Sequence, residues 1–165
     1  EQSISHALDG GFDLLLIDAS AGLGAAWSEL VGPPDMTMMR DAIAILRRMG
    51  REEEVDLVYF GGLRSGTDAA KAIALGAVAM VFGVPVGIAA GGQISEDNDM
   101  TFTADLTEEE RALAVANIIK ASTGEASMMA RCTGKTNLQN LEPEDLRSLT
   151  LATEAASGIV LAGRR

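Results

Sequence analysis

Apolar residues in this chain gather in short runs that polar or glycine-rich turns separate. Three runs, at residues 12–17, 55–60 and 77–82, have the length of buried strands. They are nearly continuous in apolar residues, as is typical of parallel strands that are covered on both faces. The pattern therefore predicts three strands of a parallel sheet.

Helical patterns lie between these strands. Residues 38–49 carry an apolar stripe of Met39, Ile43, Leu46 and Met49, with Thr37 as the predicted N-cap and a glycine after the last turn. Small, helix-favouring residues follow the second strand, and the oxygens of Thr67 and Asp68 are predicted to cap this second helix. Alternation of strand and helix predicts an α/β fold with right-handed crossovers.

The character of the chain changes after Gly92. Residues 93–105 are polar and are predicted to form a loop, and Thr107 and Glu110 form a capping box that begins a helix through residue 130. Pro143 is predicted to begin a final helix, which ends at Gly158. We therefore divide the chain into residues 1–92, which carry the strand–helix units, and residues 93–165, whose loop and helices pack on them.

A strand end, a glycine turn and a helix start follow one another at residues 55–77. Gly61 and Gly62 let the backbone approach a ligand closely, and the first N–H groups of the next helix add donors for an anion. A second such turn, at Gly83 and Val84, follows the next strand. Two such turns fit the phosphate pocket after strands seven and eight of a β/α barrel.

The length of the chain limits this prediction. A closed eight-stranded barrel needs about 250 residues, and this chain has 165. We therefore predict the C-terminal part of a TIM (β/α)8 barrel, with about three strands and additional C-terminal helices. Because the sequence begins with Glu1 rather than methionine, we expect it to be part of a longer protein. Unpaired strand edges predict a partner chain or a remaining barrel segment.

Charge and cysteine content exclude several classes of function. The net charge of -11 argues against nucleic acid or an anionic membrane as partner. No uninterrupted apolar run reaches membrane-spanning length, and no signal peptide is recognisable. The single cysteine, Cys132, is interpreted as a small buried hydrophobic residue, and it predicts a reducing, cytoplasmic location.

Asp18 and Ser20 follow the first strand, where barrel enzymes place functional groups. An equally good interpretation is that Asp18 only caps the turn. The sequence has no Ser/His/Asp set, no histidine pair at metal spacing and no Walker loop. We therefore assign no catalytic residue.

Residues 61–77 resemble a motif of FMN-dependent β/α barrels, GG-hydrophobic-R-x-G-x-D-hydrophobic-x-KA-x-x-LGA, which occurs in 2-hydroxy-acid oxidases and in glutamate synthases. Residues 18–26, DASAGLGAA, are similar to the glycine-rich loop after strand six of glutamate synthases, D-G-x-x-G-G-T-G-A. Residues 132–163 are similar to the end of the same barrels. The chain thus resembles the FMN-binding central domain of the glutamate synthase family.

The resemblance implies FMN as the cofactor and a small-molecule substrate. In the family, the flavin reduces 2-iminoglutarate, formed from 2-oxoglutarate and ammonia, to glutamate; the isolated chain is expected to be inactive. The implied cofactor-binding residues form two groups: those at the phosphate are Gly61, Gly62, Leu63, Gly83 and Val84, with Arg64 as a further candidate, and those near the flavin ring are Asp18, Gly22 and Gly24.

Departures from the family pattern keep other readings open. Phe60 stands where an acidic residue is common, while Leu23 and Val84 each replace a threonine. Residues 91–105 contain no cysteine, so an iron–sulfur cluster is not supported. The alternatives are another FMN- or phosphate-binding barrel oxidoreductase, similar to 2-hydroxy-acid oxidases, and a degenerate, non-catalytic barrel module.

Overall fold

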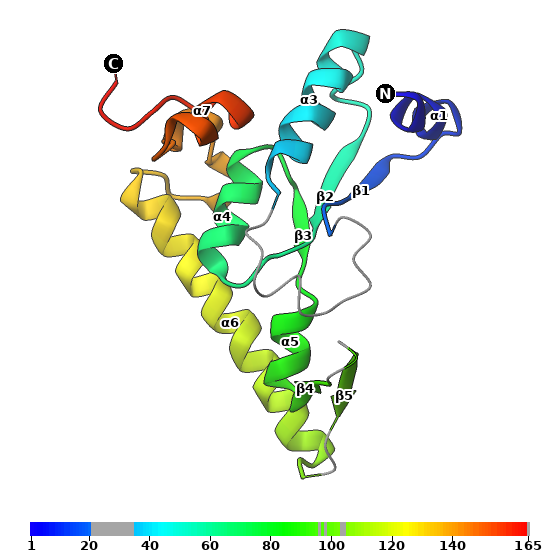
Figure 1. Ribbon diagram of the computed structural model, residues 1–165, viewed down its shortest axis with the longest axis vertical. Coiled ribbons are helices and arrows are strands. Elements are labelled where there is room, and N and C mark those ends of the chain that lie inside the picture. Colours follow the sequence, from blue (N-terminus) through cyan, green and yellow to red (C-terminus); the bar gives the residue numbers. More distant parts are fainter. Residues whose placement is uncertain (21–34, 96, 98, 103–104, 165) are drawn as a thin grey trace.

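A parallel sheet of three strands forms the centre of the molecule (Figure 1). The structure, a computed structural model, describes residues 1–20, 35–95, 97, 99–102 and 105–164. The strands are β1 (Leu14–Asp18), β2 (Asp56–Phe60) and β3 (Ala79–Val81), in the order β1-β2-β3. Their register pairs Asp18 with Phe60 and Phe60 with Val81, so the three carboxyl ends lie at one edge. The three predicted strands are confirmed, with shorter ends.

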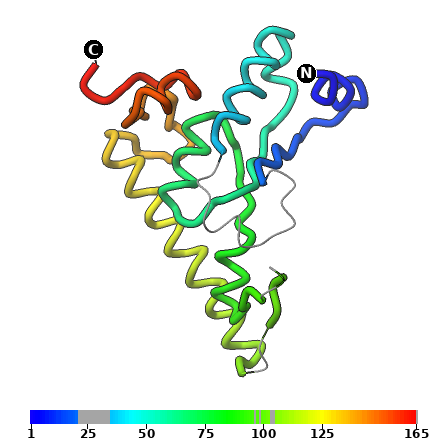
Figure 2. The backbone as a smooth tube through the Cα atoms, in the orientation of Figure 1, coloured from blue at the N-terminus to red at the C-terminus, as the bar shows by residue number. Residues whose placement is uncertain are grey.

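Helices connect and flank the strands. In chain order, α3 (Thr37–Met49) comes between β1 and β2, and α4 (Gly66–Ala74) comes between β2 and β3. In Figure 2 the yellow trace of α6 runs beside the green traces of α4 and α5, which it contacts. The other helices and 3-10 turns in the described residues are α1 (Gln2–Asp9), α5 (Val84–Ala89), α6 (Glu108–Cys132), η1 (Leu138–Asn140), η2 (Pro143–Asp145) and α7 (Leu151–Ser157). No helix in the described ranges combines the length and apolar character needed to cross a membrane.

The core lies between one face of the sheet and the helices. Leu57 and Tyr59 alternate along β2 and point to this side, where they pack with Met39 and Leu46 of α3. Among the residues that the structure describes, these four are the largest fully buried side chains, so the predicted apolar stripe of α3 is confirmed as core.

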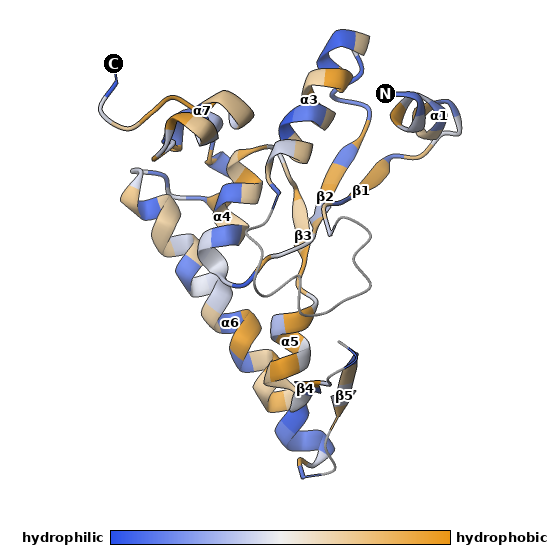
Figure 3. Ribbon diagram, viewed as in Figure 1, coloured by the Kyte–Doolittle hydropathy of each residue, from blue (hydrophilic) through white to orange (hydrophobic). Residues whose placement is uncertain are grey.

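The opposite face of the sheet is open along its edge strands. Leu14 and Leu16 of β1 are each 52% exposed, and Val81 of β3 is 42% exposed. Figure 3 shows the hydrophobic colouring of β1. Parallel sheets are normally covered on both faces. This apolar face, and the outer sides of β1 and β3, which pair with no further strand among the described residues, are features of an incomplete barrel.

The prediction of a loop at residues 93–105 is wrong. Strands β4 (Gly92–Ile94) and β5 (Met100–Phe102) pair antiparallel there, with Gly92 opposite Phe102. The sulfur of Met100 lies so close to Gly87 and Gly92 that neither position has room for a Cβ atom. Strands of three residues are too short to show a periodic pattern, so neither the strands nor this contact with α5 can be predicted from the local sequence.

The predicted final helix from Pro143 is also corrected. Residues Pro143–Asp145 form only a 3-10 turn, and Ser148 then pairs parallel with Leu161. Helix α7 begins later because Thr150 accepts a hydrogen bond from the backbone N–H of Thr153 at 3.1 Å. Its end at Gly158, with φ 68°, is as predicted.

Side-chain caps explain two of the helix starts. The capping box of α6 is confirmed, since Thr107 accepts from the N–H of Glu110 and Glu110 accepts from that of Thr107. The predicted N-cap Thr37 is wrong, because it is the first helical residue and donates its N–H to Asp35 Oδ1 at 3.0 Å. The capping acceptor therefore lies two residues upstream of the predicted position.

Tyr59 supplies a test of the core. Its side chain is fully buried, its hydroxyl has no hydrogen-bond partner among the described residues, and burial raises its pKa. An unsatisfied buried hydroxyl costs about 1–3 kcal/mol, so Tyr59→Phe should raise the free energy of unfolding of the full-length protein. Chemical denaturation measures this. A matched change of Leu57→Ala on the same face should lower it by about 2–5 kcal/mol; destabilisation by Tyr59→Phe would show that the hydroxyl has a partner.

Candidate functional site

The turn after β2 has a backbone conformation that strongly favours glycine. Gly61 and Gly62 have φ values of 125° and 66°, which side-chain-bearing residues rarely adopt. A Cβ atom on Gly61 would also lie 2.6 Å from the backbone carbon of Ala19. The turns after β1 and β2 are thus packed backbone against backbone, and Phe60 accepts a hydrogen bond from the N–H of Ala19 at 2.8 Å.

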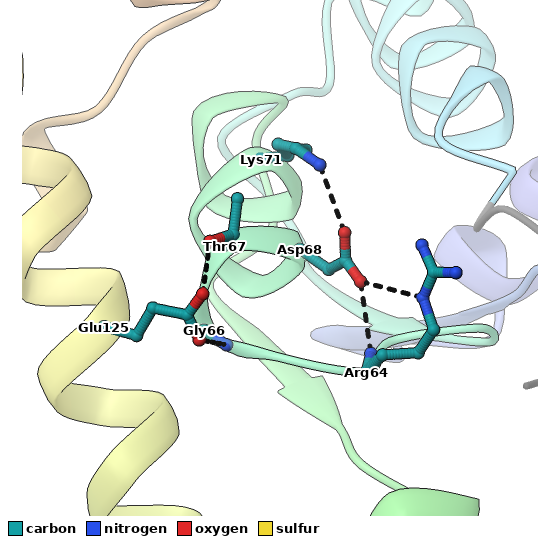
Figure 4. Close-up of polar contacts among 6 residues, drawn as sticks. All are labelled: Arg64, Gly66, Thr67, Asp68, Lys71 and Glu125. Carbon is teal, nitrogen blue, oxygen red and sulfur yellow. Dashed lines mark hydrogen bonds and ion pairs between the residues drawn. The ribbon is translucent and has the colours of Figure 1, made fainter.

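Asp68 fixes the end of this turn (Figure 4). Its carboxylate, which is almost fully buried, accepts from the backbone N–H of Arg64 at 3.2 Å and from Arg64 Nε at 3.4 Å. Lys71 Nζ lies 3.1 Å from its other oxygen. The prediction that Asp68 caps the first N–H groups of α4 is wrong, because it bonds the turn before the helix. Arg64 is held through Nε while its side chain stays 43% exposed.

Glu125 of α6 occupies the start of α4. Its Oε2 accepts from the backbone N–H of Gly66 at 2.8 Å, and its Oε1 accepts from the Thr67 hydroxyl at 2.5 Å (Figure 4). The Thr67 hydrogen bond and those from the backbone lower the pKa of Glu125. The sequence interpretation that this helix start offers its donors to a phosphate is therefore corrected: a carboxylate of the same chain already binds there.

The second glycine turn follows β3. Gly83 precedes α5 and accepts from the backbone N–H groups of Val86 and Gly87, each at 3.1 Å, and Val84 is buried. Because Phe60 pairs with Val81, this turn and the one at residues 61–64 leave the sheet at the same edge. The structure thus brings Gly61, Gly62, Leu63, Arg64, Gly83 and Val84 to adjacent strand ends; their contact with a cofactor stays a prediction.

Asp18 lies at the same edge, at the end of β1. Its Oδ1 accepts from the N–H of Ser20 at 2.9 Å and from the Ser20 hydroxyl at 2.5 Å, and these bonds lower the pKa of Asp18. The carboxylate therefore caps its own turn, on the sheet face that also carries Leu14 and Leu16. The predicted ring-side residues Gly22 and Gly24 lie outside the described residues.

Other predicted features are placed away from this edge. Cys132 ends α6 and is exposed, so its interpretation as a buried residue is wrong. Within the described ranges, no three histidine, cysteine or acidic side chains are grouped to hold a metal ion.

Comparison with known proteins identifies the family. The family model described as a conserved region in glutamate synthase matches residues 1–136. The chain belongs to the glutamate synthase family. A relative, the glutamate synthase large subunit-like protein of Rhizobium meliloti strain 1021, is 33% identical over 189 residues. The match covers 95% of this chain and 43% of that relative, so this glutamate synthase family chain spans less than half of its relative.

Solved structures show the same fold. The flavin-binding domain of baker's yeast flavocytochrome b2 matches 99% of this chain and 35% of its own, with a TM-score of 0.66 and 19% identity. A mutant flavocytochrome b2 with benzoylformate matches with a TM-score of 0.65 and 19% identity. The predicted fold class, part of a (β/α)8 barrel with further helices, is thereby confirmed.

The contact between α4 and α6 gives a second test. A Cβ atom on Gly66 would clash with the carbonyl oxygen of Ser122. We expect Gly66→Ala to push the helices apart and lower the free energy of unfolding by about 3 kcal/mol or more. Chemical denaturation of the full-length protein measures the change.

Gly124 is the matched control, because it is also helical and a Cβ atom there would meet nothing within 4 Å. Gly124→Ala should stabilise by about 0.5–1 kcal/mol through helix propensity. Equal effects of the two substitutions would contradict the close approach of α4 and α6.

Proposed function

We propose that this chain is the C-terminal part of the FMN-binding barrel of a glutamate synthase-type oxidoreductase. The observation that carries the proposal is the pair of glycine turns, at residues 61–64 and 83–84, on adjacent strands of a glutamate synthase family chain. The likeness to a flavin-binding barrel domain supports the same reading.

The residues at this edge fit a phosphate group. Gly61 and Gly62 are buried, and because they carry no side chain their backbone would meet a ligand directly. Arg64 adds a half-exposed guanidinium, whose planar fork suits phosphate oxygens. Arg64 is paired with Asp68 through Nε, so the phosphate would meet the outer nitrogens of the guanidinium. The backbone of Gly62, Leu63 and Gly83 would hold the phosphate, and Arg64 would neutralise part of its charge.

The proposed reaction is the reduction of 2-iminoglutarate, from 2-oxoglutarate and ammonia, to glutamate. FMN, when bound, supplies the hydride chemistry. The role of this chain would be to anchor and orient the cofactor. Asp18 and its turn would lie on the side of the flavin ring. Substrate-contacting groups belong to the rest of the protein, so the isolated chain should be inactive. A cytoplasmic location, proposed from the single cysteine, suits this metabolic role.

The visible spectrum of the purified full-length protein tests this function. Bound flavin absorption is expected, and the chemically reduced flavin should be reoxidised by 2-oxoglutarate plus ammonia. A protein that is colourless and gains no flavin on reconstitution would support a non-catalytic module instead. Reduction of the flavin by a 2-hydroxy acid would favour the oxidase alternative.

A pair of glycine substitutions locates the phosphate in the same assay. Gly62→Glu places a carboxylate at the turn and should abolish flavin retention. Gly11→Glu is the matched control: Gly11 also has a positive φ, 77°, but it precedes β1 at the opposite edge of the sheet. Flavin retention by the Gly62 variant would show that the phosphate binds elsewhere.

We further propose that the remaining barrel segment, in the same protein or a partner chain, covers the open sheet face. This chain spans only about a third of the flavocytochrome b2 chains that share its fold. Leu16, at the centre of β1, would then lie inside the complete barrel.

A charge on Leu16 tests this barrel completion. In the full-length protein, Leu16→Asp should lower the free energy of unfolding by about 3 kcal/mol or more, because it buries an unpaired charge. Leu149→Asp is the control, since Leu149 is 85% exposed and lies outside the sheet. Thermal or chemical unfolding measures both; a Leu16 variant as stable as the control would show that the face stays open to water.

A further inference from the structure

Helix α6 contacts the first turn of α4, which follows the proposed phosphate-binding turn in the sequence. Glu125 binds with both carboxylate oxygens, one to the N–H of Gly66 and the other to the hydroxyl of Thr67. Gly66 has no room for a side chain, because the backbone of Ser122 and Ala126 fills the space. The start of α4 is thus fixed by a residue 59 positions away in the sequence.

The turn itself needs such support. Glycines lose more conformational freedom on ordering than other residues, and Gly61 and Gly62 stand side by side there. Asp68 holds the N–H of Arg64 at one end of the short link to α4, and Glu125 holds the N–H of Gly66 at the other. Ser65 alone separates these two anchored residues. Two carboxylates therefore fix the path of the backbone where it leaves the turn.

We propose that Glu125 is a positioning residue for the flavin phosphate, which it does not itself touch. It keeps the turn at residues 61–64 in the conformation that presents backbone N–H groups to the anion. It also fills the positive end of α4, so that the phosphate binds at the turn rather than at the helix start. This inference rests on the proposed function.

Both contacts gain strength from the negative charge of the carboxylate. Gly66 presents an N–H donor and Thr67 presents a hydroxyl donor, and each bonds a separate oxygen of Glu125. Glutamine has one acceptor oxygen, which can still accept from the N–H of Gly66, and its amide nitrogen can donate to the Thr67 hydroxyl. Glu125→Gln therefore preserves the size of the side chain but removes its negative charge, so both contacts become weaker, neutral hydrogen bonds.

The test is FMN binding by the Glu125→Gln variant of the full-length protein. Flavin fluorescence titration should give about tenfold weaker FMN binding, because the turn spends less time in the binding conformation. At saturating FMN, the phosphorus NMR signal of the bound phosphate should shift from its wild-type position. The visible spectrum of the bound ring should be unchanged, because the ring would lie on the side of Asp18 and not in this turn.

Glu154→Gln is the matched control. Glu154 also accepts from a backbone N–H, that of Leu161 at 3.0 Å, and pairs with Arg164 at 3.0 Å, but it lies in the α7 region. This variant should bind FMN within about twofold of the wild type and leave the phosphorus signal in place. If Glu125→Gln fails to fold, Thr67→Val serves instead, because it removes only the hydroxyl contact of the same carboxylate.

Each outcome decides the inference. FMN binding within twofold of the wild type, or weaker binding with an unchanged phosphorus signal, would overturn it, because Glu125 would then serve stability alone. A wild-type protein that binds no FMN would overturn the proposed function itself. If the wild type binds FMN and the Glu125→Gln variant binds it equally well, only the positioning role is overturned.

Discussion

Parallel pairing of β1, β2 and β3 places the segments that follow these strands next to one another. The register brings Asp18, Phe60 and Val81 to one edge, so the segments after all three strands leave the sheet together. Parallel strands need crossover connections, which α3 and α4 supply on one face, where Leu57 and Tyr59 are buried. The glycine turns then need no contact beyond the strand pairing to become neighbours. Their closeness follows from the sheet.

Backbone groups near this edge are bound by carboxylates of the same chain. Asp18 bonds the turn after β1, Asp68 bonds the N–H of Arg64, and Glu125 bonds that of Gly66. Charge-assisted bonds to backbone N–H groups are stronger than neutral ones, so they suit a backbone that contains consecutive glycines. Residues 108–132 therefore contribute to the site even though our division of the chain at residue 92 assigned them to a separate unit.

The sequence allowed local features to be predicted better than contacts between distant segments. The three strands, the apolar stripe of α3 and the capping box at Thr107 depend on neighbouring residues, and the structure confirms them. The start of α7 was missed because Thr150 competes with Pro143 as a helix start. The hairpin β4–β5 depends on Met100 packing against glycines of α5 and β4. Glu125 was missed because nothing in the local sequence of α6 points to a partner 59 residues earlier.

A crystal structure of the full-length protein with FMN is the most direct test of the account. It should place the phosphate within hydrogen-bond distance of the backbone N–H groups at residues 62–63 and 83–84, with Arg64 turned towards it and Glu125 still bound to Gly66. A phosphate that displaces Glu125 from the start of α4, or that binds away from these two turns, would contradict the account.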